Sequence, residues 1–165
     1  MNQTKRIIIV VIILFVIIAV VLAVDFLQRQ NAASQLPADM PPGSIPIYVN
    51  GKFTASFVSE DLNQLGLVSF VDDEEGKTQE GYLLRDVILL YIDGGSLDSD
   101  TSVKVSSSSR EKVQTLTWEE IDQFNNMVLF DISGRGTLKL VSKIPGFDIR
   151  DAWVQDVDKI EITTP

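Results

Sequence analysis

The hydrophobic pattern divides the chain into an apolar N-terminal run and a longer part where apolar and polar residues alternate in short stretches. The run is unbroken from Ile7 to Val24, with Lys5 and Arg6 before it and Asp25 after it. A helix needs about 20 such residues to cross a bilayer. The pattern predicts one transmembrane helix, and the basic flank predicts a cytoplasmic N-terminus with the rest of the chain outside.

A cleaved signal peptide is the alternative interpretation of this run. Val21-Leu22-Ala23 would be an acceptable cleavage site before Val24. The run is longer than the usual core of about 7 to 15 residues and is rich in Ile and Val, which favours retention as a signal anchor. We therefore expect an anchor over residues 1–27, a Pro-containing stalk over 28–44 and an extracytoplasmic domain over 45–165.

Short alternating stretches predict that this domain is rich in β-strands. Asn50-Gly51 separates the apolar stretch at 47–49 from alternating Phe53, Ala55 and Phe57, which is typical of a hairpin with a type I′ turn. Further strands are expected at 67–71, 103–105, 112–116, 127–132, 138–142 and 157–162. So many short strands favour a single β-rich domain.

Three short helices are expected between these strands. Leu84, Val87, Ile88 and Tyr91 have helical spacing, so one face of a helix is apolar while Arg85 and Asp86 point outward. Thr117 and Glu120 form a capping box that opens a short helix, and Ser59 can cap another that ends at Gly66. The acidic stretch 72–76 is expected to be a solvated hairpin tip, since it lacks the ligand spacing of a calcium loop.

Composition excludes several functional classes. With 14 basic and 23 acidic residues the net charge is −9, which argues against nucleic acid as a partner because such binding requires a basic surface. The chain contains no cysteine and no histidine, so disulfides, catalytic triads and metal sites of thiolate or imidazole are excluded. A catalytic site built on a pair of carboxylates is not excluded by the composition.

Two segments resemble the molybdopterin-binding domain of the sulfite oxidase family. Residues 81–88, GYLLRDVI, resemble the family's G-V-P-L-R-D-V-L helix opening. Residues 137–162 resemble its closing segment, a P-L-R-L-V strand, a P-G turn, W-V-K and an I-E-V strand; the matches are Thr137 to Val141, Pro145-Gly146, Trp153-Val154-Gln155 and Ile160-Glu161-Ile162. The resemblance implies an α+β fold, a β-rich mixed-sheet domain of sulfite-oxidase type with short helices.

Departures from the family pattern bear on function. The cysteine that holds molybdenum in the family is missing from this chain. In the family an arginine and a lysine approach the pterin phosphate, and their positions are occupied here by Lys139 and Gln155. A histidine of the family pattern is replaced in the neighbourhood of Gly134, and the position of a family arginine is occupied by Ala152. Lys139 keeps a charge but not the planar fork that grips phosphate. The candidate cofactor-binding residues are Lys139, Arg150, Trp153, Gln155 and Arg85.

These features favour a non-catalytic module that binds a small ligand or a membrane-complex protein, without metal or cofactor. The alternatives are a molybdopterin-dependent oxidoreductase with unusual contacts and a purely structural subunit of a membrane complex. Trp153 bears on the choice, because an exposed ring beside Arg150 would favour binding and a buried ring would be a core aromatic.

Overall fold

The computed structural model describes residues 14, 18, 20, 40–132 and 136–165, and the chain divides into two units, Met1–Ala38 and Asp39–Pro165. Within the described residues, no helix is long and apolar enough to span a bilayer. Most of the expected transmembrane run, most of the expected stalk and Gly134 lie outside the described residues. The second unit contains two β-sheets and a few short helices, which makes it an α+β domain.

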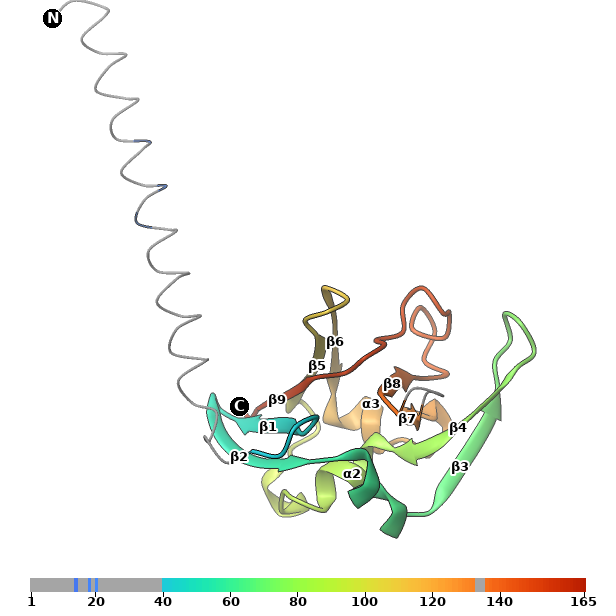
Figure 1. Cartoon of the computed structure of the whole chain (residues 1–165), viewed down its shortest axis with the longest axis horizontal. Helices are drawn as coiled ribbons and strands as arrows, with labels where there is room; N and C mark the ends of the chain where they lie inside the picture. Colours follow the sequence, from blue (N-terminus) through green and yellow to red (C-terminus); the bar gives the residue numbers. More distant parts are fainter. Residues whose placement is uncertain (1–13, 15–17, 19, 21–39, 133–135) are drawn as a thin grey trace, which may run out of the picture. The chain divides into compact units, whose positions relative to one another are not determined.

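The first sheet has five strands in the order β2-β1-β9-β5-β6 (Figure 1). Its strands are β1 (Ile45–Val49), β2 (Lys52–Phe57), β5 (Ser102–Ser107), β6 (Lys112–Thr117) and β9 (Lys159–Thr163). The sheet is mixed, because β1 and β9 are parallel while the other neighbours are antiparallel. The predicted hairpin is confirmed: Asn50 and Gly51 link β1 to β2 with φ angles of 50° and 75°.

The second sheet has four antiparallel strands in the order β3-β4-β7-β8. They are β3 (Leu67–Val71), β4 (Thr78–Leu83), β7 (Leu129–Ile132) and β8 (Leu138–Val141). Gly81 in β4 lies so close to β7 that an added Cβ would be 1.9 Å from the carbonyl oxygen of Phe130. The glycine of the sequence motif at 81–88 is therefore required by the close approach of β4 and β7.

Helix α2 (Leu84–Leu89) begins directly after β4. Three of the four residues of the predicted apolar face, Leu84, Val87 and Ile88, are fully inaccessible to solvent. The fourth, Tyr91, lies beyond the end of the helix and is half-buried. Helix α3 (Trp118–Asp122) begins with the predicted capping box, in which the Thr117 hydroxyl accepts from the amide of Glu120.

The described part of the domain also contains three 3₁₀ helices: η1 (Ser59–Gln64), η2 (Gly94–Ser96) and η3 (Phe124–Asn126). The sequence prediction of the N-cap of η1 was wrong. The N-cap position is Val58 and not Ser59, and the carboxylate of Asp61 accepts from the Val58 amide. The end of the helix agrees with the prediction, since Leu65 is the C-cap and Gly66 follows it, although the backbone of Gly66 is not left-handed.

Candidate functional site

The connection between β8 and β9, residues 142–158, brings most of the candidate residues together. In Figure 1 this orange-red segment lies between the β3–β4 hairpin and the β5–β6 hairpin. It is bonded to both: the amide of Arg150 donates to Glu74 Oε2 at 2.9 Å, and the ammonium of Lys112 donates to the carbonyl oxygen of Asp151. The connection therefore links hairpins that belong to different sheets.

Trp153 is the centre of this arrangement. Only 2% of its surface is exposed, so the side chain is a core aromatic and not an exposed binding residue. Lys139 Nζ lies 5.1 Å from the ring centroid and Arg150 Cζ lies 5.6 Å from it. Both distances permit cation–π attraction. The structure thus unites three of the predicted site residues around one buried indole.

Lys139 is held by two partners inside the protein. Its Nζ lies 2.7 Å from Asp131 Oδ2 and donates to Gln79 Oε1 at 2.8 Å. The side chains of Lys139 and Asp131 are only 19% and 17% exposed. Because a half-buried charge needs a fixed counter-charge, this ammonium is committed to the fold.

Arg150 belongs to a second charged group, at the base of the β3–β4 hairpin. Its Nη2 lies 3.3 Å from Glu75 Oε2 and 3.9 Å from Asp72 Oδ2. The Asp72 carboxylate also accepts from the Glu75 amide at 2.7 Å and from Gln79 Nε2 at 2.8 Å. Gln79 therefore connects this group to Lys139.

Asp72 corrects the sequence interpretation of the acidic turn. The prediction placed the whole stretch in solvent, but Asp72 is 2% exposed. Its pKa is lowered, chiefly by the hydrogen bond from the Glu75 amide and further by Gln79 and Arg150, against the opposing effect of burial. The hydrogen bond from Lys77 is the first cause of the lowered pKa of Glu75. Asp73, Glu74 and Glu75 are exposed, as expected of a hairpin tip.

Gln155 lies in a small open pocket of about 200 Å³ beside Trp153. Arg110, Lys112, Trp153 and Gln155 line this pocket. Arg110 Nε donates to Asp156 Oδ2 at 2.7 Å. Within the described parts of the chain, the buried Nε atoms of Trp153 and Arg150 have no hydrogen-bond acceptor. The pocket therefore has a cationic rim beside an aromatic wall.

Arg85 is not part of this group. It lies on α2, where its Nε is 3.1 Å from Asp86 Oδ1 and its Nη1 is 3.6 Å from Asp122 Oδ1. About a third of the side chain, 32%, is exposed. Arg85 lies off the buried face of α2, as predicted, but it is half-buried rather than solvated, and its partners identify it as a link between α2 and α3.

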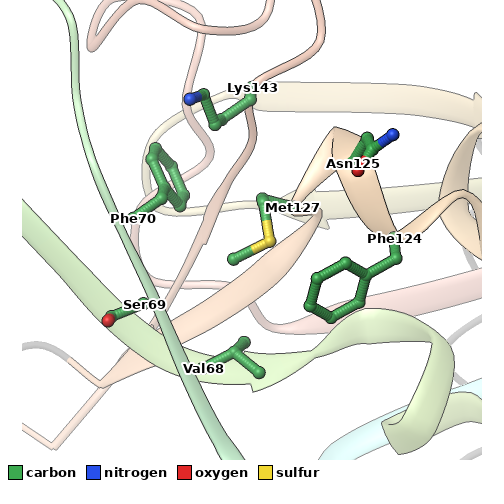
Figure 2. A pocket seen from close by; sticks show the side chains of 7 residues that line it. All are labelled: Val68, Ser69, Phe70, Phe124, Asn125, Met127 and Lys143. Carbon is green, nitrogen blue, oxygen red and sulfur yellow. The ribbon is translucent and has the colours of Figure 1, made fainter.

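A larger hollow, of about 450 Å³, opens beside β3 and was not predicted from the sequence. Its lining is mainly apolar: Val68, Ser69, Phe70, Phe124, Asn125, Met127 and Lys143. Figure 2 shows Val68, Phe124 and Met127 pointing toward one another. Met127 has a left-handed backbone, with φ and ψ of 45°, at the end of η3. Phe124 remains 56% exposed at this hollow.

The sequence contains little that could have revealed the hollow. Its pattern places Phe124 at the end of a helix and Met127 at the start of a strand, and both are apolar types normally assigned to the core. The 3₁₀ turn between them leaves the ring exposed and buries Met127, and the depression forms where this turn meets β3. Comparison of the chain with protein-family models and with curated proteins gave no match.

Proposed function

We propose that residues 45–165 form a non-catalytic protein-binding module with a fold of sulfite-oxidase type, held outside the cytoplasm by an N-terminal membrane anchor. One observation carries the proposal against catalysis. Lys139, the cation expected to meet a pterin phosphate, is already neutralised by Asp131 and bonded to Gln79. Releasing it for a phosphate would leave a half-buried carboxylate without its partner.

The arrangement of the two motifs supports the proposed fold type. The G-x-x-L-R-D segment crosses from β4 into α2, and the closing segment supplies β8, the connection and β9. Trp153 lies next to Val154, whose backbone pairs with Leu140 of β8. The motifs thus occupy adjoining parts of one domain, as the resemblance requires.

A protein partner is favoured over a small ligand because the larger hollow is open and mainly apolar. Its volume of about 450 Å³ falls in the range of binding sites, but it is open and its rim carries the exposed ring of Phe124, which is more typical of a protein contact than of an enclosed ligand site. Such a surface would let the anchored domain recruit or hold another extracytoplasmic protein.

Metal analysis of the protein purified from its native membrane tests the non-catalytic part of the proposal. We expect no molybdenum or tungsten to remain with the chain after gel filtration, because the chain has no thiolate and its nearest cations are internally paired. Stoichiometric retention of either metal would instead establish the oxidoreductase alternative. A matched control is the Lys139→Met variant, which should show the same metal content as the unaltered chain.

Protease treatment of intact spheroplasts tests the topology. We expect the domain to be digested while a small membrane-embedded fragment is retained, because Lys5 and Arg6 precede the apolar run. Protection of the domain would contradict the orientation. A mature N-terminus at Val24 would show that the run is a cleaved signal.

A small ligand at the pocket beside Trp153 is the second candidate function. The observation that favours it is the buried indole N–H without an acceptor, next to the cationic rim of Arg110 and Lys112. Titration with acetate or inorganic phosphate, followed by tryptophan fluorescence, should then give a saturable change. That change should be lost in Lys112→Met and kept in Lys104→Met, which removes an ammonium from the neighbouring strand β5.

A further inference from the structure

Strand β3 is an edge strand whose composition differs from that of the other edges. It lies at the end of the four-stranded sheet and pairs only with β4 among residues 40–132 and 136–165. Of the described strands at sheet ends, β2, β6 and β8 each contain a lysine, whereas β3 (LVSFV) has no charged residue. Proteins commonly protect an edge with lysine or proline. The β3 edge lacks this protection.

The hydrogen-bond register shows which backbone groups face the free side. The amide of Asp72 donates to the carbonyl oxygen of Lys77, so these two residues form a hydrogen-bonded pair just after β3. Hydrogen-bonded and non-hydrogen-bonded pairs alternate along an antiparallel ladder, which fixes the bonded positions of β3. Val68 and Phe70 are bonded to Gly81 and Gln79 of β4. Leu67, Ser69 and Val71 consequently direct their N–H and C=O groups outward, where an additional strand could pair with them.

The hollow lies against the same edge. Three consecutive β3 residues line it, and Figure 2 shows the Ser69 side chain pointing away, so the backbone of Ser69 contributes to the lining. A strand placed along β3 would direct alternate side chains to the face of Val68 and Phe70. An apolar side chain on that face would meet Phe124.

Charge indicates the chemistry of the strand that fits. From Ser59 to Glu80 the chain carries seven carboxylates and one lysine, and although Arg150 pairs with Asp72 and Glu75, the segment that contains β3 keeps a negative net charge. At the C-terminal end, Asp73 and Glu74 are exposed. Two copies of β3 side by side would bring these like charges together, which disfavours self-pairing. A partner with basic residues at the ends of an apolar strand is complementary.

We propose that β3 accepts an extended apolar segment of another protein, flanked by lysine or arginine, as a fifth strand of its sheet. The inference rests on the proposed function as a protein-binding module and specifies how the partner is bound. Main-chain hydrogen bonds to Leu67, Ser69 and Val71 supply the docking, the hollow accepts an apolar side chain, and the acidic flanks select basic ends.

Peptide binding to the full-length chain in detergent micelles tests this mode. The probe has an alternating valine–threonine core with lysines at both ends. One control replaces the lysines with glutamates, and a second keeps the lysines but carries N-methyl groups on alternate core amides, which removes the donors of one edge. We expect each control to bind weaker by about tenfold or more. Raising the salt concentration should weaken binding of the lysine peptide.

Amide hydrogen exchange identifies the strand. With the lysine peptide bound, exchange at Leu67, Ser69 and Val71 should slow by about tenfold or more. Exchange at Val68 and Phe70 should change little, because these amides are already bonded to β4. Slowed exchange at the first three residues without peptide, increasing with protein concentration, would show self-pairing and overturn the assignment of a basic partner.

Ser69→Pro is the sharpest variant. The substitution removes an N–H that points away from β4, and an edge strand tolerates proline at such a position. We therefore expect β3 to pair with β4 as before and the peptide to be rejected. If this variant does not fold, Phe124→Ser serves instead, because its side chain is 56% exposed. Val113→Ser is the matched control: it alters a 54% exposed residue on β6 and should leave peptide affinity unchanged.

Two results would overturn strand addition. One is absence of binding by the lysine peptide. The other is equal binding of its N-methylated form without slowed exchange at Ser69, which would show attraction by charge alone. Neither result would decide the non-catalytic assignment, which depends on the metal analysis of the native protein.

Discussion

Lys139 of β8 and Asp131 of β7 lie directly opposite each other in the antiparallel pair, with Nζ 2.7 Å from Oδ2. Because Gln79 of β4 accepts from the same ammonium, three strands are joined through one charge. Gln79 also donates to Asp72, which faces Arg150. The residue expected to contact a cofactor is thus the centre of a network that stabilises the fold.

Lys139→Met should lower the free energy of unfolding by about 1 to 3 kcal/mol, because it leaves Asp131 and Gln79 without their donor. Asp131→Asn should have a smaller effect. A double-mutant cycle should give a coupling energy of about 0.5 to 3 kcal/mol. Urea titration monitored by tryptophan fluorescence measures these free energies of unfolding, since both tryptophans are buried. Strictly additive losses would show that the pair contributes no mutual stabilisation.

The charged group at Asp72 predicts a specific dependence on pH. Its pKa in the folded protein is below the ordinary value of 3.8, so the unfolded state binds more protons in that window. The stabilisation is fully present above pH 3.8 and is lost as the pH falls through the folded pKa. Asp72→Asn should therefore lower the urea midpoint at neutral pH, and the difference from the unaltered chain should shrink in acid. Asp73→Asn, at an exposed neighbour, should show no such convergence.

Helix α2 allows a direct comparison of a buried and a partly exposed side chain. Ile88→Ala should cost about 2 to 5 kcal/mol by leaving a cavity at a fully buried position. Arg85→Ala should cost about 1 kcal/mol or less, because its ion pairs with Asp86 and Asp122 are partly solvated. Denaturant titration of both variants provides the comparison. Equal losses would show that Arg85 has a larger role in packing α2 against α3.

Gly81→Ala should destabilise the domain by about 1 to 3 kcal/mol or more, because the added methyl group would meet the backbone of Phe130 and separate β4 from β7. Gly66→Ala is the control, as no atom lies within 4 Å of its added Cβ. Thermal unfolding of the two variants should differ clearly. A stable Gly81→Ala protein would mean that the two strands can move apart at little cost.

The sequence alone determined the local elements of this domain. Asn50-Gly51 specified a hairpin, Thr117 and Glu120 a helix start, and the spacing of Leu84, Val87 and Ile88 a buried face, because each signal acts between residues close in the chain. Alternating apolar residues likewise located most of the strands. The absence of cysteine and histidine from the sequence also limited the chemistry that its side chains can perform.

Only the tertiary structure decided the pairing of strands and the partners of charged residues. Lys139, Gln79 and Arg150 are far apart in the sequence, and no local pattern indicates that they share one network. The burial of Asp72 depends on Gln79 and on a connection that arrives from the end of the chain. The hollow beside β3 has the same origin, because it forms where η3 and β3 meet, and their approach is a long-range contact that residue spacing does not encode.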